Sequence, residues 1–315
     1  MKNSTTFLFI LLLLLSAGRL SAQKITFTPH RTAQAQFAGY YVAREKGFYE
    51  EYGLEVEIEH PTSTRLVVGY IVRGQSQVIT MPLCQAMQMI GDGWEFVNIL
   101  QTSMNNALVI VSGNDENPVE QKGIRVGTWS AGFDQIAFCM SLKERLEYEW
   151  IPIASSTSSL LITGAIDAVM AMSYDDYYIL KQSGIRLTDD NVYRFSEHDY
   201  NVQDDGVYMT RSFYENNKDV ARRFAEASKK GWEWAAEHPE ETLDIVMEYV
   251  AKDHIATNRT LQRLQLQEVL RLQLDRESGQ REFRLRPDMV SLACRLMKES
   301  QLLLNEVTYE DIIAK

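Results

Sequence analysis

The sequence has few cysteines, and they are far apart. Cys84, Cys139 and Cys294 form no CxxC pair and no Cys/His cluster. A structural zinc site needs such ligands at short spacing, so we expect no metal site. Because the number of cysteines is odd, at least one thiol cannot form a disulfide within the chain. We expect three small, buried, apolar residues, with one disulfide as the alternative.

The sequence also lacks common catalytic motifs and an excess of basic residues. It has no HExxH, no GxSxG and no phosphate-binding P-loop. Lys and Arg number 32 against 43 Asp and Glu, which gives a formal charge of −11. A surface of this sign repels the phosphate backbone, which argues against nucleic acid as a partner.

Long apolar runs are missing except at the N-terminus. Lys2 precedes an apolar run at residues 7–15, and residues 16–22 (SAGRLSA) that follow are mostly small. A membrane-spanning helix needs ~20 residues, so this run is too short for an anchor. It is typical of a signal peptide. We predict a signal peptide at residues 1–22, cleavage near Ala22 and export to the periplasm.

After this segment, short strands alternate with helices. Residues 24–28 predict a strand, 34–46 a helix that ends at Gly47, and 54–59 a strand that alternates apolar and acidic residues. This order suggests a parallel βαβ unit in an α/β protein. Further strands are predicted at 77–80, 96–100, 107–111, 124–126, 168–172 and 207–210, and further helices at 65–72, 83–90, 133–146, 175–182, 214–237, 239–250, 258–274 and 287–304.

A polar loop at residues 112–121 divides the chain. We predict one lobe from residues 23–111 plus 207–315, and a second lobe from residues 112–206 inserted into it. Ligands of open α/β sheets bind beyond the carboxyl ends of the strands. The loops after the strands would therefore line a cleft between the lobes, which we expect to close about a hinge.

Several segments resemble a known family. Residues 27–30, 36–49 (QFAGYYVAREKGFY) and 52–56 (YGLEV) resemble the opening of the nitrate/sulfonate/thiamine-precursor group of periplasmic binding proteins. Residues 123–127 (GIRVG), 164–178 (GAIDAVMAMSYDDYY) and 204–208 (DDGVY) resemble the branch that binds thiamine pyrimidine precursors, which is related to fungal thiamine-pyrimidine synthases. The resemblance covers nearly the whole chain after residue 22, in the same order.

The resemblance implies a type II periplasmic binding protein fold, a small-molecule ligand and an ABC importer as partner. The ligand it implies is a thiamine pyrimidine precursor or a similar small heterocycle. The alternative is the same fold binding a sulfonate-like solute or signalling to a membrane sensor.

A third hypothesis is a synthase enzyme that consumes its own His and a pyridoxal cofactor, with His30 as the possible counterpart. The chain departs from that pattern, because residues 193–205 lack the cysteines of the fungal enzymes and Phe27 stands where the family often has Trp. We therefore expect a monomeric binding protein without catalysis and without a cofactor.

A pyrimidine-like ligand needs aromatic faces for stacking and a few fixed donors and acceptors. The alternative roles are core packing for the aromatic residues, turn or helix-end chemistry for the polar ones and a hinge role for Asp205. The candidate loops carry aromatic and acidic side chains, which favours a neutral or cationic heterocycle. We place Trp232 in the core. The predicted ligand-binding residues are Phe27, His30, Gln36, Phe37, Tyr40, Thr80, Met81, Thr102, Trp129, Ser130, Met172, Tyr174, Asp175 and Asp205.

Overall fold

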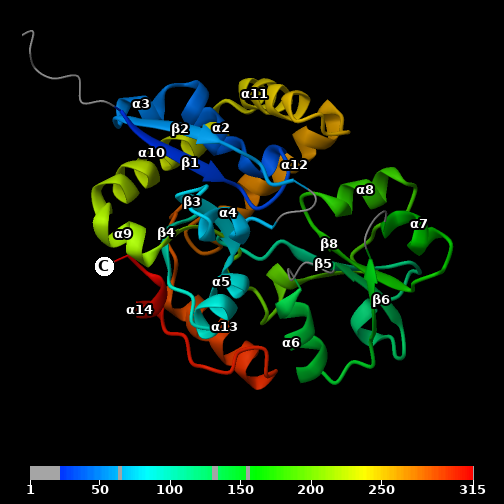
Figure 1. Ribbon diagram of the computed structural model, residues 1–315. Coiled ribbons are helices and arrows are strands. Elements are labelled where there is room, and N and C mark those ends of the chain that lie inside the picture. Colours follow the sequence, from blue (N-terminus) through cyan, green and yellow to red (C-terminus); the bar gives the residue numbers. More distant parts are fainter. Residues whose placement is uncertain (1–21, 63–65, 130–133, 154–156, 315) are drawn as a thin grey trace, which may run out of the picture.

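The computed structural model describes residues 22–62, 66–129, 134–153 and 157–314. The predicted signal peptide, apart from Ala22, lies outside these residues. The described chain contains two separate five-stranded sheets, with orders β2-β1-β3-β10-β4 and β7-β6-β8-β5-β9. We call the first sheet with its helices the first lobe, and the second sheet with α6, α7 and α8 the second lobe (Figure 1).

The first sheet begins with the predicted βαβ unit. Its strands are β1 (Gln23–Thr28), β2 (Leu54–Ile58), β3 (Val78–Pro82), β4 (Phe96–Gln101) and β10 (Asp205–Thr210). β1 pairs in parallel with both β2 and β3, which confirms the unit. Ile25 lies opposite Val56 in the register, and both are buried, while Glu55 and Glu57 are exposed. The alternation of apolar and acidic residues therefore reflects one buried and one solvated face.

The second sheet repeats this arrangement. It contains β5 (Leu108–Ser112), β6 (Arg125–Trp129), β7 (Glu149–Ile153), β8 (Ala168–Met172) and β9 (Val192–Arg194). In both sheets three parallel strands are followed by an antiparallel one, β10 in the first and β5 in the second. The sequence did not predict β7 or β9. Pro152 obscures β7, because proline is tolerated only at a sheet edge, where β7 lies.

The strand β5 lies in the second sheet, on the other side of the predicted lobe boundary. We placed residues 107–111 in the first lobe, but β5 pairs with β8 and β9 in the second sheet. An apolar run does not itself indicate which sheet it joins. We therefore propose that the chain crosses between the lobes at residues 102–107 and returns at 195–204, while the exact division stays a prediction.

Helices cover both sheets. The predicted helix at 214–237 is interrupted, because Asn217 leaves the helical region (φ −141°, ψ 37°) and its side chain donates to the carbonyl of Phe213. Gly47 does adopt the left-handed conformation expected after a helix (φ 74°). The helices are η1 (Ala35–Phe37), α2 (Ala38–Glu45), α3 (Phe48–Glu51), α4 (Val68–Val72), α5 (Leu83–Gly91), η2 (Pro118–Glu120), α6 (Gln135–Lys143), α7 (Thr157–Ile162), α8 (Asp176–Gln182), η3 (Phe195–Glu197), α9 (Arg211–Asn216), α10 (Lys218–Glu237), α11 (Pro239–Lys252), α12 (Arg259–Leu272), α13 (Pro287–Glu299) and α14 (Tyr309–Ile312).

Two glycines let α2 and α10 approach closely. A Cβ on Gly231 would lie 2.1 Å from the carbonyl oxygen of Gly39, and a Cβ on Gly39 would lie 2.2 Å from the ring of Trp232. No side chain fits at either position, so the indole lies directly on the backbone of α2. This contact fixes the place of Trp232 beside the site described below.

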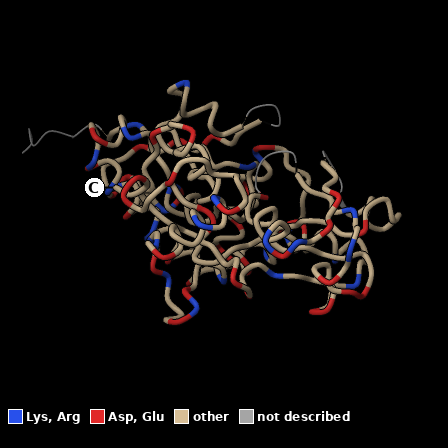
Figure 2. The backbone as a smooth tube through the Cα atoms, turned by 90° about the horizontal axis from the view of Figure 1, so that it is seen from below, with Lys and Arg blue, Asp and Glu red and all other residues tan. Residues whose placement is uncertain are grey.

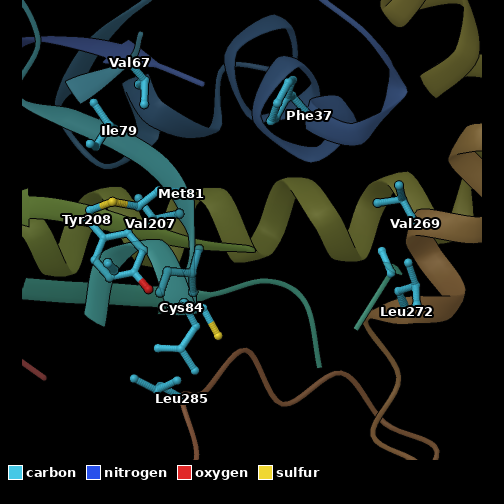
Figure 3. Packing of buried hydrophobic residues seen from close by; sticks show 14 of the residues in the cluster. Phe37, Val67, Ile79, Met81, Cys84, Val207, Tyr208, Val269, Leu272 and Leu285 are labelled. Carbon is cyan, nitrogen blue, oxygen red and sulfur yellow. The ribbon is translucent and has the colours of Figure 1, made fainter. Parts of the chain in front are cut away.

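The core of the first lobe packs around β3 and β10. Figure 3 shows Met81, Val207 and Tyr208 together, with Cys84 beside them. All three cysteines are buried and none forms a disulfide, so the favoured prediction of small buried thiols is confirmed. Among the described residues, the helices are all too short or too polar to cross a membrane. Acidic and basic residues are interspersed along both lobes (Figure 2).

Candidate ligand-binding site

The carboxyl ends of the parallel strands in the two sheets face each other. His30 and Arg31 follow β1, whereas Tyr174 and Asp175 follow β8. Arg31 Nη1 lies 3.4 Å from Asp175 Oδ2, so the two strand ends are in direct contact. This is the position that open α/β sheets use for ligands.

A small cavity of about 20 Å³ lies at this junction. Four of the predicted site residues line it, namely Gln36, Thr102, Tyr174 and Asp205. This volume suits about one water molecule, so a heterocycle would require the lobes to move apart. The other lining residues are Ser103, Trp232, Val269, Leu272 and Gln273.

Two buried polar atoms near this cavity lack hydrogen-bond partners among the described residues. They are the indole nitrogen of Trp232 and the hydroxyl of Tyr40, each on a side chain that is 1% exposed. Thr102 and Trp232 lie beside the Tyr40 hydroxyl without meeting hydrogen-bond geometry. Buried polar groups are nearly always paired, so the unpaired nitrogen of Trp232, a residue that lines the cavity, indicates a site for a partner molecule. Burial also raises the pKa of Tyr40, which keeps its hydroxyl protonated.

Asp205 provides an acceptor at the same cavity. Gln36 Nε2 donates to its Oδ2 at 2.5 Å, whereas its Oδ1 lies 3.7 Å from His30 Nε2, beyond hydrogen-bond distance. The pKa of His30 is lowered to about 4, chiefly by burial, against the opposing charge of Asp205. His30 is therefore neutral near pH 7. Its Nδ1 lies 2.7 Å from Thr80 Oγ1, which also accepts from the His30 backbone N–H.

The neighbouring Asp204 has a different environment. Its carboxyl lines a second cavity of about 20 Å³, together with Met172 and Gln135 of the second lobe. Burial, and then the charge of Asp205, raise its pKa to about 8. Asp204 is therefore mainly protonated at pH 7. Of the two adjacent acids, only Asp205 lines the first cavity, together with Tyr174 and Trp232.

An ion pair between the lobes lies at the rim. Arg31 contacts Asp175, and its guanidinium carbon lies 6.0 Å from the ring centre of Trp129. Burial and the charge of Asp176 raise the pKa of Asp175 to about 6, while Arg31 opposes the rise. The sequence analysis noted aromatic and acidic side chains in the candidate loops and did not consider Arg31. It overlooked Arg31 because a single basic residue after a strand gives no pattern.

Not all predicted residues reach the cavity. Phe27 packs edge-on against Tyr40, with ring centroids 4.8 Å apart, and Met81 is fully buried. Phe37 packs edge-on against His30, with ring centroids 5.5 Å apart. These three contribute to the core beneath the site, and none lines the cavity. Ser130 lies outside the described residues.

The sequence analysis also missed two contributors. Trp232, predicted to be core, is buried but lines the cavity. Val269 and Leu272 come from α12, on which buried Gln262, Gln265 and Glu268 recur every three residues. Such a polar stripe on a buried helix face is the signal that could have pointed to α12. Among the described residues, no cluster of three His, Cys, Asp or Glu side chains could hold a metal ion.

Comparison with known proteins gives one family and one fold. The family model described as "NMT1/THI5 like" matches residues 34–242. A formylaminopyrimidine-binding protein of Halalkalibacterium halodurans is 23% identical over 66% of this chain and 64% of its own length. The chain spans 60% and 64% of the lengths of the two curated relatives it matches.

Solved structures share the whole fold at low identity. The periplasmic aliphatic sulphonate binding protein SsuA of Escherichia coli has a TM-score of 0.66 and 12% identity, covering 93% of this chain and 92% of its own. The desulfurization enzyme DSZB has a TM-score of 0.60 and 13% identity, covering 92% and 96%. The predicted periplasmic binding protein fold is therefore confirmed. Both binding proteins and an enzyme have this fold, so the fold alone does not identify the function.

Proposed function

Because the chain belongs to the NMT1/THI5-like family, we propose that it is an exported solute-binding receptor of an ABC importer, with a thiamine pyrimidine precursor or a similar small heterocycle as ligand. The formylaminopyrimidine-binding relative supports this ligand class. Export to the periplasm agrees with the signal-like pattern of residues 1–22.

The observation that carries the proposal is a donor beside an acceptor at one cavity. The Trp232 indole N–H can only donate, and the Asp205 carboxylate can only accept. An aminopyrimidine presents the complementary edge, because its amino group donates and the adjacent ring nitrogen accepts. Tyr174 lines the same cavity and offers an aromatic face for the ring.

We would test the proposal by thermal unfolding of the mature protein with single compounds. The panel contains hydroxymethyl- and formylaminomethyl-pyrimidines, thiamine, taurine, alkylsulfonates, nitrate and pyridoxal phosphate. A ligand at ~100 times its Kd stabilises the folded state by about 2.7 kcal/mol. We expect a shift with the pyrimidines that is lost in Asp205→Asn and kept in Asp199→Asn, which changes an exposed acid between η3 and β10.

A sulfonate-like ligand is the second candidate, because Arg31 supplies a cation at the rim. Its guanidinium already contacts Asp175, which makes the site less suited to an anion. Stabilisation by sulfonates but not by pyrimidines would reject the pyrimidine assignment and favour this alternative. An enzyme of the synthase type would instead show absorbance from bound pyridoxal phosphate.

A further inference from the structure

Three buried glutamines connect helix α12 to Asp205. Gln265 Nε2 donates to Gln34 Oε1 at 2.8 Å, and Gln34 Nε2 donates to Gln36 Oε1 at 2.8 Å. Gln36 Nε2 then donates to Asp205 Oδ2 at 2.5 Å. All three glutamines are less than 9% exposed, so water does not compete for these bonds.

The direction of this hydrogen-bond chain is set most strongly at Asp205, because its carboxylate can only accept. At the other end Gln265 Oε1 accepts from the backbone N–H of Ala35 at 3.2 Å, and the same N–H also donates to Gln262 Oε1 at 2.7 Å. Rotating any one amide by 180° would place donor against donor and acceptor against acceptor at its two neighbours. A buried mismatch of this kind costs about 1–3 kcal/mol for each polar group left unpaired.

We propose that Gln265 and Gln34 are positioning residues of the ligand site, which turn the amide nitrogen of Gln36 toward Asp205 Oδ2 and so leave Asp205 Oδ1 as the acceptor that selects a ligand with a hydrogen-bond donor. The selection rests on the proposed function, because it takes Asp205 as a ligand contact. The direction of the chain rests on the structure alone and can be measured without a ligand.

The chain also sets the tautomer of His30. With its oxygen held by Gln34, Gln36 presents its amide nitrogen to His30 Nε2 at 3.4 Å. Nε2 then accepts, and the ring proton lies on Nδ1, which donates to Thr80 Oγ1. If Gln36 were turned over, its oxygen would face Nε2 and favour the proton there. The tautomer of His30 therefore reports the direction of the whole hydrogen-bond chain from Gln265 to Asp205.

The test is ¹⁵N NMR of the ligand-free protein labelled at histidine, with the His30 signal assigned by its loss in His30→Gln. In the wild type at pH 7 we expect a neutral ring protonated at Nδ1. Gln265→Glu keeps an acceptor for Ala35 but puts an acceptor in place of the donor to Gln34, so Gln34 should turn and present its oxygen to Gln36. Gln36 then faces an acceptor on both sides, at Gln34 and at Asp205, and an Nε2-protonated form of the His30 ring should appear beside the wild-type form. Gln265→Met removes the donor without supplying an acceptor, so Asp205 should keep Gln36 and His30 in their wild-type orientation.

Gln262→Glu is the matched control. Gln262 lies one turn earlier on α12, is also buried, and its oxygen also accepts from the Ala35 N–H, at 2.7 Å. Its amide nitrogen donates to Thr257, outside the chain. We expect His30 to keep its wild-type form in this variant. A wild-type His30 protonated at Nε2, or a Gln265→Glu variant whose His30 signal matches the control, would overturn the proposal whatever the ligand panel shows.

Discussion

Tyrosine hydroxyls in the first lobe differ in how well they are paired. The hydroxyl of Tyr49 lies 2.9 Å from Ser228 Oγ, whereas that of Tyr40 has no hydrogen-bond partner among the described residues. Both side chains are buried. An unpaired buried hydroxyl lowers the free energy of unfolding unless a bound molecule forms a hydrogen bond with it. At Tyr40 the ligand can be that molecule.

We therefore predict opposite effects for the same substitution at these two positions. Tyr40→Phe should leave the free energy of unfolding unchanged or raise it by about 1 kcal/mol, because it removes an unpaired group. Tyr49→Phe should lower it by about 0.5–1.5 kcal/mol, because it breaks a hydrogen bond. Urea unfolding of both variants measures this, and a clear loss of stability in Tyr40→Phe would contradict our view of that hydroxyl.

At the scale of elements, the contact of α2 with α10 positions Trp232. Gly39→Ala would place a methyl group 2.2 Å from the indole ring, so the indole must move. We predict a loss of about 1–3 kcal/mol of stability from this overpacking, together with weaker binding of the pyrimidine found in the panel. Tryptophan fluorescence and thermal unfolding would measure the two effects.

Gly91→Ala on α5 is the control for this substitution. Its methyl group would meet only side chains, the nearest being the end of Leu303 at 2.5 Å, which can rotate away. We expect a smaller loss of stability and unchanged ligand binding. Equal effects of the two substitutions on ligand binding would show that Trp232 is not placed by the close helix approach.

The strand and helix pattern could be predicted from the sequence, but the convergence of distant residues on the site could not. Periodicity located β1, β2 and α2, and with them Gln36 and Tyr40 near the cleft. It gave no warning that α12 would supply Val269 and Leu272, because a buried helix face shows the same pattern whatever it packs against. Trp232 was assigned to the core for the same reason, since burial and ligand contact look alike in sequence.

At the scale of the whole molecule, one cation connects the two lobes among several acids. Arg31 of the first lobe lies near Tyr174, Asp175 and Asp176 of the second lobe, and near Asp205. Without it, half-buried carboxylates would face one another unopposed. The ion pair with Asp175 therefore favours a closed arrangement of the lobes.

We predict that Arg31→Ala opens the ligand-free protein at pH 8. Its radius of gyration from small-angle scattering should exceed that of the wild type. It should fall again at pH 5, because the pKa of Asp175 is already raised to about 6 and rises further without Arg31, so protonation removes the repulsion. Arg263→Ala, which breaks the pair with Glu240 inside the first lobe, should leave the radius unchanged at both pH values. Equal radii for the two variants would rule out the connecting role of Arg31.

The order of strands in the first sheet also determines when the protein can fold. The strand β10 lies between β3 and β4, so Asp205 pairs with Pro82 across a long stretch of intervening chain. The first sheet cannot close until residue 210 has been synthesised and brought back. Pairings this far apart in sequence form slowly. A nascent chain therefore cannot complete its first sheet before residue 210 emerges, and a chain that is still incompletely folded suits the export that we propose.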